Sequence, residues 1–156
     1  MENRKIGLLG AGNMAGALIR GLLGSKTLRP EQIRASDPRA DQLAQLETSY
    51  GIETHADNSE LLAWANVVVL AVKPQVIGQV LERVSREIQR DTLVISIAAG
   101  VPLAALEARL PAGARVLRAM PNTAAIALAG ATGIAPGSHA TPEDIRFAKA
   151  SMIIIT

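Results

Sequence analysis

The stretch KIGLLGAGNMAGALIRGLL, residues 5–23, decides the fold that this chain is expected to adopt. An apolar run that begins at Lys5 leads into the glycine pair Gly10 and Gly12, and apolar residues at helical spacing follow. This order predicts a buried strand, a tight turn and a helix whose inner face carries Met14, Leu18 and Leu22. The turn either holds a ligand or only joins two buried elements.

The small residues of this turn suit a dinucleotide. Gly10 permits a sharp turn, Gly12 has no Cβ and lets a pyrophosphate approach the backbone, and Ala15 allows the helix to pack closely on the strand. The helix N-terminus presents free N–H groups and the positive end of its dipole to the phosphates. We therefore expect bare amide groups over residues 10–13. The alternative is a structural glycine turn without a ligand.

Short apolar runs alternate with segments of helical period along the rest of the chain. Strands are expected over 5–10, 33–36, 67–72, 93–97 and 115–119, and helical spacing is seen, for example, at Val76, Val80, Val84 and Ile88. Strand–helix units with short connections give parallel sheets. We predict one doubly wound, Rossmann-type α/β domain over residues 1–156, with a mostly parallel sheet and helices on both faces. Beyond residue 119 we expect a strand near 131–135, a short helix capped by Thr141 and a final strand over 152–156.

The composition argues against several classes of function. The chain has no cysteine and only two histidines, far apart in the sequence, so we expect no metal site and no thiolate chemistry. Its net charge is +2 with scattered basic residues, and only three residues are aromatic, so we expect no nucleic-acid partner. The longest apolar run, residues 67–72, is too short to cross a bilayer, and no signal peptide is recognisable, so we expect no membrane partner and a cytoplasmic location.

The residues after the second expected strand bear on the choice of nucleotide. Asp37 could bond the ribose 2′-hydroxyl of NAD, or it could cap the following helix together with Pro38. If Asp37 caps the helix, Ser36 and Arg39 can meet the 2′-phosphate of NADP, with Arg39 as the charge partner. This second reading favours NADP and leaves NAD possible.

Four stretches together resemble the N-terminal domain of pyrroline-5-carboxylate reductase: GLLGAGNMAGALIRGLL, VVVLAVKPQVI, ISIAAGV and RAMPNTAA. They occur in the order and spacing of that family, over residues 5 to about 135, and RAMPNT at 118–123 is the most specific of them. The resemblance implies an oxidoreductase that uses NADPH to reduce the cyclic imine pyrroline-5-carboxylate to L-proline, the last step of proline biosynthesis. Hydride would pass from C4 of the nicotinamide to the imine carbon, with the cofactor supplying the reducing power.

The resemblance also implies which residues hold the cofactor. These are Leu9, Gly10, Ala11, Gly12, Asn13 and Met14 at the pyrophosphate, Ser36, Asp37, Arg39 and Asn58 at the adenosine, and Ala71, Val72, Lys73, Pro74, Ile97, Ala98 and Ala99 along the nicotinamide ribose. Met120, Pro121, Asn122 and Thr123 would lie near the nicotinamide and the substrate. Some of these residues have structural alternatives: Lys73 and Pro74 could end a strand, Asn122 could cap a turn, and Asn58 could cap a helix.

In the resembled family a second, helical domain follows. It forms the homodimer and contributes the hydroxyl that donates to the imine nitrogen, so no catalytic residue is assigned in these 156 residues. We expect this chain to bind the cofactor without turning over substrate. Two alternatives stay open: a non-catalytic NADP(H)-binding sensor, and a related Rossmann reductase such as a β-hydroxyacid dehydrogenase, against which RAMPNT argues.

Overall fold

The computed structural model of the chain describes residues 3–121 and 132–152. Within them, one seven-stranded sheet has the order β3-β2-β1-β4-β5-β6-β7. Strands β1 to β6 pair in parallel, and β7 pairs antiparallel to β6. The strands are β1 (Ile6–Leu9), β2 (Ile33–Ser36), β3 (Glu53–His55), β4 (Val67–Leu70), β5 (Leu93–Ser96), β6 (Arg115–Pro121) and β7 (Thr132–Pro136).

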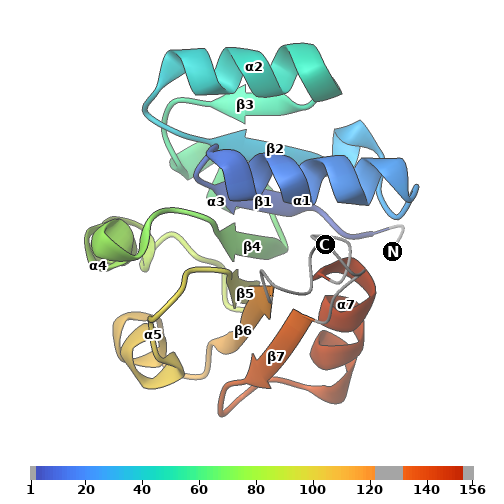
Figure 1. Cartoon of the computed structure of the whole chain (residues 1–156). Helices are drawn as coiled ribbons and strands as arrows, with labels where there is room; N and C mark the ends of the chain where they lie inside the picture. Colours follow the sequence, from blue (N-terminus) through green and yellow to red (C-terminus); the bar gives the residue numbers. More distant parts are fainter. Residues whose placement is uncertain (1–2, 122–131, 153–156) are drawn as a thin grey trace.

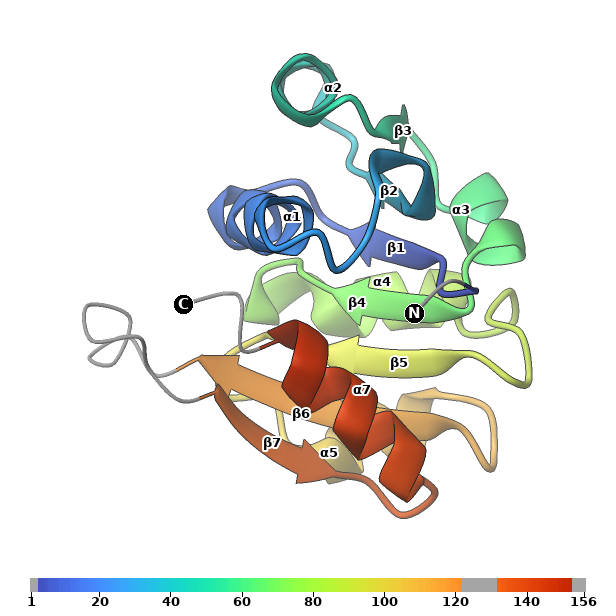
Figure 2. The ribbon, with the colours of Figure 1, turned by 90° about the vertical axis from the view of Figure 1, so that its right-hand side faces the viewer.

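Helices cover both faces of this sheet (Figures 1 and 2). One face packs against α1 (Asn13–Gly24), α2 (Ala40–Tyr50) and α7 (Pro142–Met152). The other packs against α3 (Ser59–Trp64), α4 (Ile77–Val84) and α5 (Leu103–Arg109). Two short 3-10 turns, η1 (Pro30–Gln32) and η2 (Pro74–Val76), precede β2 and α4. The predicted doubly wound, mostly parallel fold is confirmed.

The apolar runs of the sequence form the centre of the sheet because their side chains are needed on both faces. In β1, Ile6 and Leu8 belong to the core under α1, whereas Leu9 belongs to the core under α3 and α4. All four residues of β4 and of β5 are likewise buried. A strand covered on both faces has no polar side, which is why these runs do not alternate.

Two elements between residues 53 and 84 differ from the prediction. The edge strand β3 was not predicted because its residues are polar; it is held by backbone pairing to β2 and by an ion pair of 3.2 Å between Arg34 and Glu53. The helix indicated by the spacing of Val76, Val80, Val84 and Ile88 also begins later, at Ile77. Val76 lies in η2 and is exposed, whereas Val84 is buried on α4 and Val80 is partly buried against the same core.

The C-terminal part was predicted in outline. Strand β7 lies where a strand was expected, although residue 131 is outside the described residues. The helix that begins after Thr141 is not short but has 11 residues. Thr141 Oγ1 accepts from the Asp144 N–H at 3.1 Å, and Asp144 Oδ2 accepts from the Thr141 N–H at 3.0 Å, which makes a reciprocal cap. Met152 ends this helix rather than starting a strand, and the remaining positions of that predicted strand, 153–156, are not described.

The strand order also fixes where a ligand can bind. The chain moves outward from β1 through β2 to β3 and then returns to β4 on the other side of β1. The loops after β1 and β4 therefore diverge, and a crevice opens beyond the carboxyl ends of these strands. Gly10 lies at this point with φ +111°, and a Cβ on it would be 2.8 Å from the carbonyl carbon and oxygen of Ala71. Only glycine fits there.

Candidate functional site

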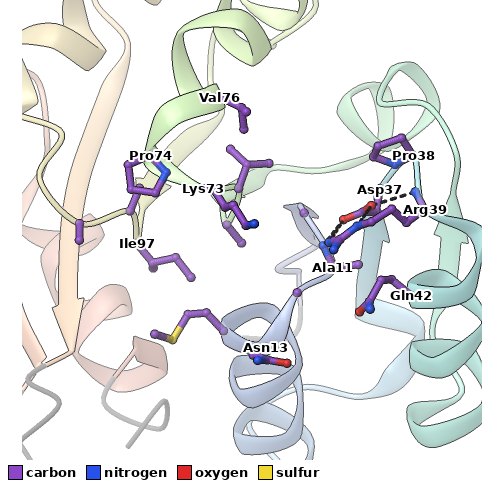
Figure 3. Close-up of a pocket in the computed structure, with 17 residues that line it drawn as sticks. Ala11, Asn13, Asp37, Pro38, Arg39, Gln42, Lys73, Pro74, Val76 and Ile97 are labelled. Carbon is purple, nitrogen blue, oxygen red and sulfur yellow. Dashed lines mark hydrogen bonds and ion pairs between the residues drawn. The ribbon is translucent and has the colours of Figure 1, made fainter.

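A cleft of about 840 Å³ lies at this crevice. Its size is in the range of ligand sites in proteins. Figure 3 shows Asp37 and Arg39 on one side of the cleft, Lys73, Pro74 and Ile97 on the other, and Asn13 at the start of α1 below them. The lining residues come from four loops: Gly10, Ala11, Gly12, Asn13, Met14, Asp37, Pro38, Arg39, Gln42, Ala71, Val72, Lys73, Pro74, Val76, Ile97, Ala98 and Ala99.

The glycine turn at the centre of the cleft is partly hydrogen-bonded to the protein itself. The Gly10 N–H donates to the Ser36 carbonyl at 2.8 Å, and the Ala11 N–H donates to Asp37 Oδ2 at 2.9 Å. The expectation of bare amides over residues 10–13 is therefore wrong for its first two residues. These two bonds tie the turn to the end of β2, which fixes its position before any ligand binds.

The amides available to a ligand begin with α1. Gly12 is the N-cap of this helix, makes no side-chain cap bond, and accepts from the Gly16 N–H at 3.0 Å. The N–H groups of the first helical turn have no intrahelical acceptors and point beyond the helix end. Together with the helix dipole they form a site for an anion.

Gly12 leaves room for such an anion. A Cβ built on Gly12 would find nothing closer than Nη2 of Arg39, at 4.0 Å. The space next to this backbone is therefore not filled by the protein, in contrast to the space at Gly10. The room and the free amides beside it fit a dinucleotide diphosphate.

Asp37 and Arg39 form an ion pair beside the turn. Asp37 is buried, and its two carboxylate oxygens accept from the backbone N–H, Nε and Nη2 of Arg39, each at 2.9 Å. The hydrogen bonds from Arg39 hold the pKa of Asp37 below its ordinary value of 3.8, against the opposing effect of burial. The same contacts raise the pKa of Arg39. Asp37 is not the helix N-cap, since α2 begins at Ala40 with Arg39 in the cap position.

Ser36 and Asn58 lie in a second, neighbouring cleft of about 450 Å³, which Leu9 also lines. The Ser36 hydroxyl donates to Asn58 Oδ1 at 2.5 Å. Asn58 stands at the N-cap position of α3, but its side chain does not cap the helix; Asp57 Oδ1 accepts the Ser59 N–H instead, at 2.7 Å. The capping alternative for the Asn58 side chain is therefore wrong. The resemblance assigns both Ser36 and Asn58 to the adenosine; the structure brings the two side chains together, and their contact with the nucleotide stays a prediction.

The other expected site residues are placed as follows. Ala71 to Pro74 and Ile97 to Ala99, which the resemblance places along the nicotinamide ribose, line the larger cleft, and Lys73 is exposed there. Met120 is half-buried near the end of β6 and is not among the lining residues. Pro121 ends β6, while Asn122 and Thr123 lie outside the described residues.

Three lining residues were missed in the sequence: Pro38, Gln42 and Val76. Val76 was noted only for its helical spacing with Val80; it is 37% exposed, because it belongs to the 3-10 turn that precedes the helix. Gln42 precedes the buried Leu43 on α2, and its only signal was its place on the polar side of that helix. Nothing in a single sequence distinguishes this position from ordinary surface.

Among the described residues, neither a metal-binding cluster nor a membrane-spanning helix is found. No group of three or more His, Asp or Glu side chains within 3–121 and 132–152 is arranged to hold a metal ion. Within the same ranges, no helix combines the length and the apolar character that crossing a membrane requires.

Comparisons with known proteins agree with this geometry. Residues 5–100 match the family described as NADP oxidoreductase, coenzyme F420-dependent. The chain is 47% identical to pyrroline-5-carboxylate reductase of Methanosarcina acetivorans over 148 residues, which are 95% of this chain and 55% of that protein. It therefore spans about half the length of this relative.

Solved structures show the same relation. Pyrroline-5-carboxylate reductase of Coxiella burnetii matches with a TM-score of 0.89 and 33% identity, over 97% of this chain and 56% of that one. Pyrroline carboxylate reductase of Plasmodium falciparum, whose crystal structure has NADP bound, matches with a TM-score of 0.84, over 99% of this chain and 56% of that one. At 24% identity, this second likeness concerns the fold alone.

Proposed function

The chain belongs to the family of NADP oxidoreductases described as coenzyme F420-dependent, and from this premise we propose that it is the nucleotide-binding part of a pyrroline-5-carboxylate reductase. The observation that carries the proposal is the identity of 47% to a protein of that name over 95% of this chain. The corresponding protein of Escherichia coli is 39% identical over 90% of the chain. The reaction is the NADPH-dependent reduction of a cyclic imine to L-proline.

The geometry of the cleft supports NADPH as the cofactor. The diphosphate would lie against Gly12 and the free amides that begin α1, where a Cβ would have only Nη2 of Arg39 within 4.0 Å. The 2′-phosphate would meet Arg39, whose side chain is 53% exposed at the side of the cleft. The strand ends at 71–74 and 97–99 would then run along the nicotinamide half, as the resemblance implies.

The chemistry divides between the cofactor and the protein. When bound, NADPH supplies the hydride that the imine carbon accepts. Among the described lining residues, the titratable side chains are Asp37, Arg39 and Lys73, and the first two are bonded to each other. The residues of this chain therefore bind and orient the nicotinamide. In the proposal, the proton donor to the imine nitrogen lies in a further helical domain, through which the protein also forms a homodimer.

The same cleft favours one alternative from a different class. A non-catalytic sensor of NADP(H) would bind the nucleotide with the same residues. None of the described lining side chains is assigned as a catalytic acid or base, so the lining fits either function. A β-hydroxyacid dehydrogenase is disfavoured by the RAMPNT sequence at residues 118–123, which carries the resemblance to the imine reductases.

Two measurements test the proposal. NADPH fluorescence is titrated with the 156-residue chain, and oxidation of NADPH with pyrroline-5-carboxylate is followed for the whole gene product. We expect saturable binding in the first and turnover in the second. Failure of the chain to bind a nicotinamide nucleotide refutes the proposal. Binding without turnover by the whole product supports the sensor. Reduction by NADPH of another imine or of a β-oxoacid, in place of pyrroline-5-carboxylate, refutes the proposed substrate.

A further inference from the structure

The carboxylate of Asp37 has no acceptor site left for a ligand. Its Oδ2 accepts from the Ala11 N–H and from Nη2 of Arg39, and its Oδ1 accepts from the backbone N–H and Nε of Arg39. A carboxylate offers about four lone-pair sites, and these four bonds use them. While Arg39 stays in this position, the acid at the end of β2 cannot accept a bond from a ribose hydroxyl.

Arg39, in contrast, keeps donors free. Its bonds to the described residues use Nε and Nη2, which leaves the Nη1 edge of the guanidinium for a ligand. Its side chain is half exposed, and Nη2 is the atom nearest to the open space beside Gly12. The exposed part of the pair is therefore the cation, and the buried part is the anion; Figure 3 shows the dashed interactions between the two side chains.

Resting on the proposed function, we infer that Asp37 and Arg39 together select the cofactor, with Arg39 masking an acid that would otherwise favour NADH. With Arg39 on Asp37, the site presents a donor edge to a 2′-phosphate. With Arg39 removed or swung away, the Asp37 carboxylate becomes an acceptor for the 2′-hydroxyl of NADH and repels the 2′-phosphate of NADPH. Asp37 is thus a positioning residue in one state and a ligand-binding residue in the other.

This arrangement predicts an inversion of preference rather than a simple loss. Arg39→Ala changes the charge of the pair from neutral to −1, directly where a phosphate of charge −1.5 to −2 would sit. A hydroxyl that bonds a carboxylate gains about tenfold or more in affinity, because bonds to charged groups are the stronger ones. The bond from the Ala11 N–H holds the carboxylate in place after Arg39 is gone.

The experiment compares the dissociation constants of NADPH and NADH, measured by nucleotide fluorescence, in four proteins: the wild type, Arg39→Ala, the double variant Asp37→Asn/Arg39→Ala and the control Arg86→Ala. Arg86 is an exposed arginine in the turn after α4, so its variant has the same change of charge away from the cleft. A purely structural defect would weaken the binding of NADPH and of NADH alike, so it would not alter the ratio of their dissociation constants.

We expect the wild type and the control to prefer NADPH, Arg39→Ala to prefer NADH, and the double variant to bind NADH about tenfold more weakly than Arg39→Ala, with a ratio near one. If the double variant does not fold, Asp37→Ser/Arg39→Ala replaces it. Equal ratios in the single and double variants overturn the inference, because Asp37 would then contribute nothing once unmasked. A wild type that binds neither nucleotide refutes the proposed function as well, whereas equal ratios with a binding wild type refute only the inference.

Discussion

Substitution of the two glycines in the turn after β1 should affect two different properties, the stability of the fold and the affinity for the nucleotide. Gly10 has φ +111°, and a Cβ there would lie 2.8 Å from the backbone of Ala71. Gly12 has φ −83°, and a Cβ there would meet no atom closer than 4.0 Å. Gly10→Ala should therefore damage the fold, and Gly12→Val should damage nucleotide binding.

The magnitudes follow from these contacts. At Gly10, a backbone conformation that is unfavourable for alanine costs about 1–3 kcal/mol, and forcing Ala71 to move adds a further ~1–3 kcal/mol. A total of about 3 kcal/mol lowers the melting temperature of a chain of this length by roughly 6–12 °C. At Gly12, the change in unfolding free energy should stay below about 1 kcal/mol, since a poorer N-cap is offset by a less flexible unfolded chain. The valine methyl groups fill the space for the diphosphate, so the affinity should fall by about 100-fold or more, which corresponds to ~2.7 kcal/mol.

The assay uses both variants side by side. Thermal unfolding without ligand gives the stability, and titration with NADPH gives the affinity; Gly12→Ala adds a smaller side chain at the same place. The reasoning is refuted if Gly12→Val binds NADPH as the wild type does, since the open space would then not hold the diphosphate. It is equally refuted if Gly10→Ala melts at the wild-type temperature.

Three further predictions concern ion pairs and polar contacts around the sheet. Arg115 Nη1 lies 2.6 Å from Oδ1 of the buried Asp144, so Arg115→Ala leaves this carboxylate without its cation. The substitution should lower the free energy of unfolding by about 3 kcal/mol in urea titrations and leave the NADPH affinity unchanged. Because the folded-state pKa of Asp37 lies below its ordinary value of 3.8, the ion pair with Arg39 stabilises the protein above that value and loses its effect as the pH falls through the folded-state pKa. The stability difference between wild type and Arg39→Ala should therefore be full at pH 6 and shrink below about pH 4 in urea titrations, and a difference that stays constant would contradict this assignment. Asn58→Ala removes the acceptor of a serine hydroxyl at the end of β2 and should weaken NADPH binding by about fivefold to tenfold in fluorescence titration, whereas unchanged affinity would make that contact purely structural.

The fold could be predicted because its signal is local and repeated. A continuous apolar strand such as β4 has one stable environment, the centre of a sheet covered on both faces, and the glycine turn marks the strand–helix junction next to it. Strand β3 could not be predicted, because its three residues, Glu53–His55, are polar and depend on backbone pairing with β2. Val76 lies outside α4 because η2 (Pro74–Val76) precedes the helix as a separate 3-10 turn.

The site could be predicted at the level of segments but not of bonds. The segments that carry Lys73 and Ile97 were assigned to the cofactor site from the family resemblance, and both line the cleft. The role of Asp37 stayed open in the sequence, since the same residue can cap a helix or accept from a ribose. The structure decides its partners through the Ala11 N–H, 26 residues away in the chain, and this contact depends on the register of β1 against β2. No local pattern contains that information.

The location of the cleft also bears on how the proposed reductase would work with the few titratable groups among the described lining residues. Where β1 and β4 separate, a ligand meets mainly backbone amides and short apolar side chains, which hold a cofactor but transfer no proton. Hydride transfer needs the donor and acceptor carbons to be held in contact, and such positioning can be worth effective molarities on the order of 10⁵ M or more. Substitutions that line this cleft should therefore act first on the dissociation constant of the nucleotide. If the protein is the proposed reductase, the pH dependence of its turnover should follow whichever group protonates the imine nitrogen, because Asp37 and Arg39 are already paired with each other.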